Sequence, residues 1–202
     1  MIYLLPTAGD MNDLPSQFGI LTTPKHGGVV KGIKQYRHFA VDNEAFTKEF
    51  DPDAFFPFLE MLRPYQLLCH FVSCPDVVGN ARATLERYDK WAHQIRAGGW
   101  PVAFVAQDGQ EDLDFPACDA VFIGGSTEWK MSPAADECIM RAKDLGLWVH
   151  IGRVNGQRRF WHFRMIGADS ADGTMIRYER DTCIRRFTAA MYQSTIDLWR
   201  AA

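Results

Sequence analysis

Several short apolar runs in this chain are closed or closely followed by a polar, acidic or glycine-rich group. These groups are Asp42, Asp76, Gln107, Gly124 with Gly125 and Ser126, His150, and Asp169 with Asp172. If the runs are strands of a parallel barrel, the groups at their carboxyl ends meet on one rim. Carboxylates there can act as a nucleophile and as a general base, and an amide offers a heterocycle both a donor and an acceptor. The residue types therefore predict a site that binds a flat, purine-like base and attacks or deprotonates with an aspartate.

Some of these groups also fit purely structural roles. Gly124-Gly125 fits a tight turn, and the two late aspartates fit turn residues. His150 fits a buried polar residue as well as a contact to the base. Trp129 and Trp161 lie beside the rim motifs, where they would either stack on a base or pack in the core.

Arginines are concentrated in the last third of the chain. They are Arg153, Arg158, Arg159, Arg164, Arg177, Arg180, Arg185 and Arg186. The net charge of the whole chain is only −3, so a nucleic-acid partner would have to be held by a local patch. Because Arg153, Arg158, Arg159 and Arg177 flank the late aspartates, we predict that they contact a phosphate backbone. The alternative is an ordinary solvated face.

Strand-like and helix-like segments alternate along the chain. We expect strands at 2–5, 38–41, 67–72, 101–106, 120–123, 147–151 and 168–170, and helices after Asp51-Pro52, over 79–97, after Ser132-Pro133, after the 152–156 loop and over 181–201. Residues 6–36 are rich in Gly, Pro and Thr, which predicts a long functional loop. Helix-length connections require parallel pairing. The pattern predicts a compact TIM-like α/β barrel. Seven strands are found, so either an eighth has been missed or the barrel is trimmed or open, and a doubly wound sheet is the alternative.

Composition places the chain among ordinary globular proteins. At 202 residues with 47% hydrophobic content, it is expected to form a single domain over 1–202 with a sizeable core. Five scattered cysteines without Cys-x-x-Cys spacing suit a reducing compartment, and Cys69-His70 with Cys74 is only a weak metal motif. The sequence shows no signal peptide and no membrane-length apolar run, so we expect a cytoplasmic protein.

Six motifs in order carry a resemblance to a known family. They are Asp42-Asn43-Glu44-Ala45-Phe46, the 73–79 segment SCPDVVG, the 105–109 segment VAQDG, the 122–130 segment FIGGSTEWK, the 150–155 segment HIGRVN and the 167–174 segment GADSADGT. Together they resemble the tRNA-guanine transglycosylase superfamily. More narrowly, they resemble its short phage and bacterial DpdA-like branch, which inserts 7-deazaguanine bases into DNA.

The resemblance implies a barrel that exchanges guanine in DNA for a 7-deazaguanine, such as 7-cyano-7-deazaguanine, through a covalent aspartyl-nucleoside intermediate. It implies that Asp172 is the nucleophile, Asp42 the general acid/base and Asp169 a supporting carboxylate. Asp76 and Gln107 would hold the base, together with the backbone of Gly124, Gly125 and Ser126. The family's zinc motif after the barrel is absent from this sequence, so no cofactor or metal is expected. The implied partners are DNA and a free 7-deazaguanine, in the host cytoplasm for a phage-encoded protein, and a homodimer or partner proteins stay open.

Three other functions are consistent with the same residues. The exchange could take place in tRNA rather than DNA. The barrel could bind nucleic acid or a deazapurine without turnover, although the aspartates at 42, 169 and 172 argue against this. It could also be an unrelated small-molecule enzyme, but no lysine follows a strand directly, which argues against a Schiff-base aldolase.

Overall fold

Eight parallel strands form a closed barrel in the part of the chain that the structure describes. This structure is a computed structural model, and it describes residues 1–6, 14–26, 38–45, 49–175 and 178–192. Strands that follow one another in sequence pair with one another, and β8 closes the barrel by pairing with β1. The strands are β1 (Ile2–Pro6), β2 (Phe18–Thr22), β3 (Phe39–Val41), β4 (Cys69–Ser73), β5 (Val102–Ala106), β6 (Ala120–Ile123), β7 (Trp148–Ile151) and β8 (Ser170–Asp172). The predicted TIM-like barrel is confirmed, and the barrel is closed.

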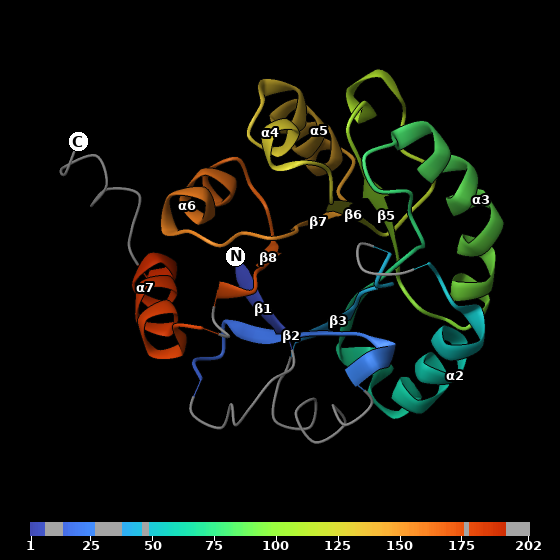
Figure 1. The fold of residues 1–202 in the computed structure, drawn as a ribbon, viewed down its shortest axis with the longest axis horizontal. Coiled ribbons are helices and arrows are strands. Elements are labelled where there is room, and N and C mark those ends of the chain that lie inside the picture. Colours follow the sequence, from blue (N-terminus) through green and yellow to red (C-terminus); the bar gives the residue numbers. More distant parts are fainter. Residues whose placement is uncertain (7–13, 27–37, 46–48, 176–177, 193–202) are drawn as a thin grey trace.

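Helices flank the outside of the barrel from α2 round to α7 (Figure 1). They are α2 (Pro52–Leu62), α3 (Ala81–Ala97), α4 (Thr127–Lys130), α5 (Pro133–Asp144), α6 (Gln157–Met165) and α7 (Arg180–Tyr192), with 3-10 turns η1 (Pro24–His26), η2 (Arg63–Leu68) and η3 (Gln110–Asp112). The predicted caps are confirmed: the side chain of Asp51 accepts from the amides of Asp53 and Ala54, and that of Ser132 accepts from Ala135. The last predicted helix, 181–201, is described only as far as Tyr192.

The strand that the sequence analysis missed is β2, which lies inside the stretch predicted to be a loop. All five of its residues are buried, and it pairs with β1 and β3. Its sequence, Phe-Gly-Ile-Leu-Thr, is short and surrounded by turn-forming residues, so the composition of the whole stretch predicted a loop. Gly19 is required there because an added Cβ would lie 2.5 Å from the carbonyl oxygen of His38. The count of seven strands was therefore wrong, and the parts of the predicted loop at 7–13 and 27–37 lie outside the described residues.

Side chains of the strands alternate between the barrel interior and the surrounding helices. The interior holds Leu4, Leu21, Ala40, Phe71, Ala103 and Ala120, with Ile2, Phe122 and Trp148 packed against them. The larger cluster between strands and helices includes Tyr3, Phe18, Phe39, Phe104 and Phe160. Because interior side chains fill the barrel, a ligand can enter only at an end, and the carboxyl ends of the strands are where polar residues gather.

Candidate functional site

A cavity of about 450 Å³ opens at the carboxyl-terminal end of the barrel. It is lined by residues that follow or end the strands: Pro6, Leu21, Thr23, Lys25, Asp42, Asn43, Glu44, Ser73, Asp76, Val78, Val105, Gln107, Phe122, Gly124, Gly152, Arg153, Asn155, Asp172 and Thr174. The structure thus brings five polar residues that the sequence predicted to one cavity: Asp42, Asp76, Gln107, Arg153 and Asp172. Its volume is in the range of small-molecule sites.

Asp172 is the last residue of β8, and its carboxylate lines the cavity. One oxygen, Oδ1, accepts a hydrogen bond from the backbone amide of Arg153 at 3.0 Å and lies 3.2 Å from Nε2 of His150. Arg153 can present its amide in this way because it adopts a left-handed conformation, with φ of 60°. The turn after β7 therefore holds the carboxylate that ends β8.

Asp42 follows β3 and lines the same cavity. Its backbone amide donates to the Thr22 carbonyl at 2.8 Å, and its Oδ1 accepts from the Glu44 amide at 3.1 Å. Burial, and secondarily the negative charge of Asp172, raise the pKa of Asp42 to about 7. Asp42 can therefore hold or release a proton near neutral pH, as a general acid/base requires.

Asp76, Gln107 and Asn43 form a hydrogen-bonded group on the cavity wall. The two oxygens of Asp76 accept from Asn43 Nδ2 at 2.9 Å and from Gln107 Nε2 at 2.6 Å. Gln107 Oε1 accepts from the Gly79 amide at 2.9 Å, which fixes the orientation of the Gln107 amide. Burial is the main cause that raises the pKa of Asp76. The group is rigid and polar, and the amide of Gln107 keeps a second proton and a second lone pair for a ligand.

Asn43 was not among the residues selected from the sequence. Its Nδ2 also donates to the Cys74 carbonyl at 2.7 Å, and its backbone amide donates to Ser73 Oγ at 2.9 Å. Asn43 thus ties the loop after β3 to the end of β4. Its position beside Asp42 in the first family motif was the signal that could have identified it.

Of the glycine motif after β6, only Gly124 lines the cavity. An added Cβ there would lie 2.8 Å from Gln107 Nε2. The amides of Gly124 and Gly125 both donate to the Ala106 carbonyl, at 2.9 and 3.3 Å, so neither offers the ligand the free N–H that the sequence suggested. Ser126 caps α4, accepting from Trp129 and donating to Asp108. The structure therefore gives Gly125 and Ser126 structural roles rather than contacts to the base.

Asp169 does not reach the cavity. It precedes β8, and its Oδ2 accepts from Lys143 Nζ at 2.6 Å and from the amide of Val149, near the start of β7, at 2.7 Å. Its carbonyl accepts from the Ile2 amide at the start of β1. These partners all lie at the amino-terminal end of the barrel. The prediction of Asp169 as a supporting catalytic carboxylate is contradicted, because the strand begins after it rather than before it.

His150 lies inside the barrel below the cavity and is fully buried. Its Nδ1 is 2.9 Å from Ser170 Oγ, and its Nε2 faces Asp172. Burial lowers the pKa of His150 below its usual value, with the Asp172 hydrogen bond opposing this. His150 does not line the cavity. The prediction of a direct base contact is therefore replaced by contact with the carboxylate of Asp172.

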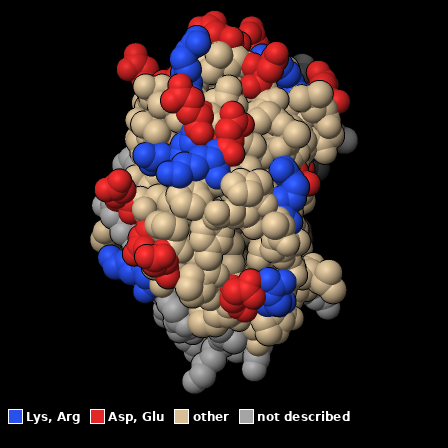
Figure 2. All heavy atoms as spheres, turned by 90° about the vertical axis from the view of Figure 1, so that its right-hand side faces the viewer, with Lys and Arg blue, Asp and Glu red and all other residues tan. Residues whose placement is uncertain are grey.

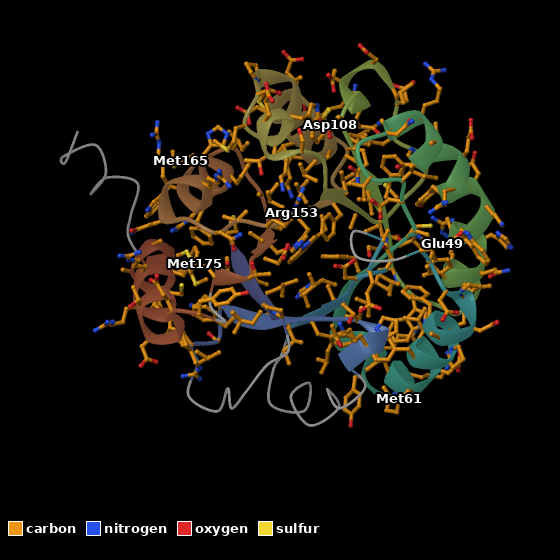
Figure 3. All side chains as sticks on the ribbon, viewed as in Figure 1. Glu49, Met61, Asp108, Arg153, Met165 and Met175 are labelled. Carbon is orange, nitrogen blue, oxygen red and sulfur yellow. The ribbon has the colours of Figure 1, made fainter. Side chains whose placement is uncertain are left out.

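Of the four arginines predicted to contact a phosphate backbone, Arg153 lines the cavity, whereas Arg158 and Arg159 do not. The guanidinium of Arg153 donates to the carbonyls of Gly124 and Gly125, which joins the loops after β6 and β7. Figure 3 shows Arg153 near the centre of the barrel end. Arg158 and Arg159 lie in the first turn of α6, where Arg158 is exposed and Arg159 is half-buried. Arg177 lies outside the described residues.

Two further residues gained roles only from the structure. Lys130, in α4, is buried and donates to the Gly152 carbonyl at 2.5 Å. Burial, and secondarily the charge of Arg153, lower the pKa of Lys130 to about 7. Asn155 lines the cavity, and its Oδ1 accepts from the amides of Thr174 and Met175, joining the loops after β7 and β8. Neither contact could be read from the sequence, because each joins segments far apart in it.

The two tryptophans proposed as stacking platforms do not line the cavity. Trp129 is buried against Gly125 and donates to Glu111 at 2.8 Å, whereas the ring of Trp161 lies under the guanidinium of Arg164. Within the described residues, no group of three or more His, Cys, Asp or Glu side chains could hold a metal ion. None of the described helices has the length and apolar character needed to cross a membrane.

Comparisons with known proteins give no family for this chain. No family model matches the sequence, and no curated protein matches it. Among solved structures, the chain is similar to a structure titled PaMucR phosphodiesterase, c-di-GMP complex, with 11% identity and a TM-score of 0.42. That alignment covers 76% of this chain and 65% of the other, so the chain spans about two thirds of its length. At this level the similarity carries no argument about function.

Proposed function

We propose that this protein is a base-exchange transglycosylase that replaces guanine in DNA with a 7-deazaguanine derivative through a covalent aspartyl-nucleoside intermediate. The observation that carries the proposal is the convergence of Asp42 and Asp172 on one cavity whose wall carries Asp76 and Gln107. Two carboxylates in different environments are what a double displacement at a sugar carbon needs. A rigid carboxylate–amide pair is suited to the polar edge of a purine.

In the first half of the reaction, a carboxylate oxygen of Asp172 attacks C1′ of the target nucleoside. The bond from C1′ to the base nitrogen breaks, and the departing guanine takes a proton from Asp42. The pKa of about 7 for Asp42 makes this proton available at neutral pH. The nucleoside is then held as an ester of Asp172.

In the second half, the 7-deazaguanine occupies the position that guanine has left. Asp42, now ionised, accepts the proton of the incoming ring nitrogen. That nitrogen attacks C1′, and the bond from C1′ to Asp172 breaks, which regenerates both aspartates. Two inversions at C1′ leave the configuration of the nucleoside unchanged.

The polymer would approach the face of the barrel that carries the cavity. Arg158 and Arg159, in the first turn of α6, are the arginines that we propose for phosphate contacts there, because the amino end of a helix also favours anions. By contrast, acidic and basic side chains are interspersed on the side built by α2 and α3 (Figure 2). A target base must leave its stack to reach a cavity of this kind, so the substrate is a flipped-out or single-stranded nucleotide.

The deciding experiment follows the base itself. DNA and tRNA, each carrying labelled guanine, are incubated with the protein and free 7-cyano-7-deazaguanine, and nucleosides are then analysed by mass spectrometry. Loss of label from DNA with gain of the deazanucleoside supports the proposal, whereas exchange in tRNA alone reassigns the acceptor. No exchange in either polymer, with a competent 7-deazaguanine, overturns it.

The role of Asp172 is tested by trapping the intermediate. The wild-type protein should form a denaturation-resistant adduct with its polymer, and Asp172→Ala should form none. Asp114→Ala removes an exposed carboxyl outside the cavity and serves as the control. An adduct that persists in Asp172→Ala would contradict the assignment of the nucleophile.

A further inference from the structure

A line of hydrogen-bonded side chains runs through the barrel interior and ends at Asp172. Trp148 Nε1 lies 2.9 Å from Ser170 Oγ, which lies 2.9 Å from His150 Nδ1, and His150 Nε2 lies 3.2 Å from Asp172 Oδ1. Ser170 and His150 are both fully buried. The three interior residues come from β7 and β8, which pair with each other. The line is therefore part of the barrel framework and not of a surface loop.

The chemistry of these groups fixes the direction of every proton in the line. An indole N–H can only donate, so Ser170 Oγ accepts from Trp148. At the other end of the line, the carboxylate oxygen Asp172 Oδ1 can only accept, so a neutral His150 ring donates from Nε2 and accepts at Nδ1 from the Ser170 hydroxyl. A neutral imidazole that accepts at Nδ1 carries its proton on Nε2. That proton points at Asp172 Oδ1.

The surroundings of His150 favour the neutral ring that this arrangement needs. The rings of Phe71 and Phe122 pack against it, with centroids 4.9 and 4.5 Å from the imidazole centroid. Burial also lowers the pKa of His150. A buried, neutral histidine orients a neighbouring carboxylate by one directed hydrogen bond, and it does not compete with the ligand for protons.

The two oxygens of Asp172 are not equivalent as a result. Oδ1 faces both His150 Nε2 and the Arg153 amide. Within the described part of the chain, no hydrogen-bond donor reaches Oδ2. Since the carboxylate lines the cavity, Oδ2 is the oxygen left to react.

We propose that Trp148, Ser170 and His150 form a positioning relay that anchors Oδ1 of Asp172 and presents Oδ2 to the sugar carbon. His150 is a positioning residue and touches neither base nor sugar. The proposal deepens the proposed transglycosylase function and rests on it for the identity of the attacked atom. The same anchor on Oδ1 would stabilise the carboxylate when it departs in the second half of the reaction.

The kinetic test compares two replacements of His150 that differ only in hydrogen bonding at the Nε2 position. His150→Leu removes the donor, and adduct formation in a single turnover should slow about 100-fold, because small losses of alignment at a reacting atom cost that much. His150→Gln places an amide donor near the position of Nε2, and it should restore the rate to within about 10-fold of wild type. Binding of the free 7-deazaguanine should change little in either variant, because His150 does not line the cavity.

A matched control is available on the surface. His162 in α6 also lies beside an aspartate, with Nε2 2.9 Å from Asp136 Oδ1, outside the cavity. His162→Leu should leave the adduct rate unchanged. Equal rates for His150→Leu and His150→Gln, or a wild-type rate in His150→Leu, would overturn the proposal.

A second measurement does not depend on activity. Nitrogen NMR of the imidazole should show His150 neutral with its proton on Nε2 at pH 7, and Ser170→Ala should allow the other tautomer to appear. In a crystal structure of His150→Leu, the carboxylate of Asp172 should rotate away from its wild-type orientation. A proton on Nδ1 in the wild type, or an unchanged Asp172 in His150→Leu, refutes the relay. These readouts still decide the proposal if no base exchange is found, which would refute the proposed function instead.

Discussion

Replacing Asp42 by asparagine should stabilise the protein at alkaline pH while removing its activity. Burial and the charge of Asp172 raise the pKa of Asp42 from 3.8 to about 7. A carboxyl whose pKa is raised in the folded state does not lower the free energy of unfolding at pH values below its unfolded pKa. As pH rises through the folded pKa, that stability is lost. The ionised Asp42 is thus a cost to the fold above neutral pH.

The size of this cost follows from the two pKa values. Each pKa unit corresponds to about 1.4 kcal/mol, so full ionisation of Asp42 costs about 4 kcal/mol. Because most of the unfolded population is already ionised at pH 5, part of the cost is present there, and the cost grows by about 2–3 kcal/mol between pH 5 and pH 8. Asparagine has the shape of aspartate and can still accept from the Glu44 amide, yet it carries no charge.

Urea unfolding of the wild type and of Asp42→Asn at pH 5, 6, 7 and 8 measures this directly. The stability advantage of the variant should increase by about 2–3 kcal/mol across that range. Asp114→Asn, at an exposed position outside the cavity, controls for the change in net charge. Adduct formation by the wild type should fall as pH rises through about 7, and Asp42→Asn should form adduct far more slowly at every pH. A stability difference that does not vary with pH would refute the reasoning.

Three further predictions concern other parts of the structure. Asp169→Asn weakens the ion pair with Lys143 at the amino end of the barrel. It should lower the free energy of unfolding in urea by about 1–2 kcal/mol and leave adduct formation intact. Loss of the adduct in a folded variant would indicate that Asp169 acts in the site after all. Gly173→Ala places a Cβ 2.6 Å from the Val154 carbonyl oxygen and should cost about 1–3 kcal/mol by thermal unfolding, and an unchanged Tm would contradict the crowding. Arg158→Ala with Arg159→Ala should reduce the slope of log K against log salt for DNA binding by about 1–2; an unchanged slope would remove both from the interface.

Much of the barrel could be predicted because its strands are apolar runs that end at polar residues. Asp42, Asp76 and Gln107 were found in this way, and each lines the cavity. β2 was missed for the opposite reason, since its five buried residues lie between turn-forming segments that dominate the composition. A parallel strand buried on both sides has no alternation that would identify it.

Asp169 shows where spacing alone fails. The segment Gly167-Ala-Asp-Ser-Ala-Asp172 can place its strand before or across the second aspartate, and the two choices send Asp169 to opposite ends of the barrel. The pairing of β8 with β7 shows which placement is right, because Ser170 pairs with His150 and Ala171 pairs with Ile151. Register is a property of two strands together, so it could not be read from one of them.

The different surroundings of Asp42 and Asp172 support the roles that we propose for them more directly than their motifs do. Asp42 accepts one backbone hydrogen bond and is raised toward neutral by burial, which suits a group that gives and takes a proton. Asp172 is held on one oxygen by a backbone amide and a buried histidine, which suits a group that must attack along one direction. Exchanging the two roles would put the proton carrier on the anchored carboxylate and the nucleophile on the one that retains a proton near pH 7. Because a protonated carboxyl is a poor nucleophile, the arrangement favours Asp172 for attack and Asp42 for proton transfer.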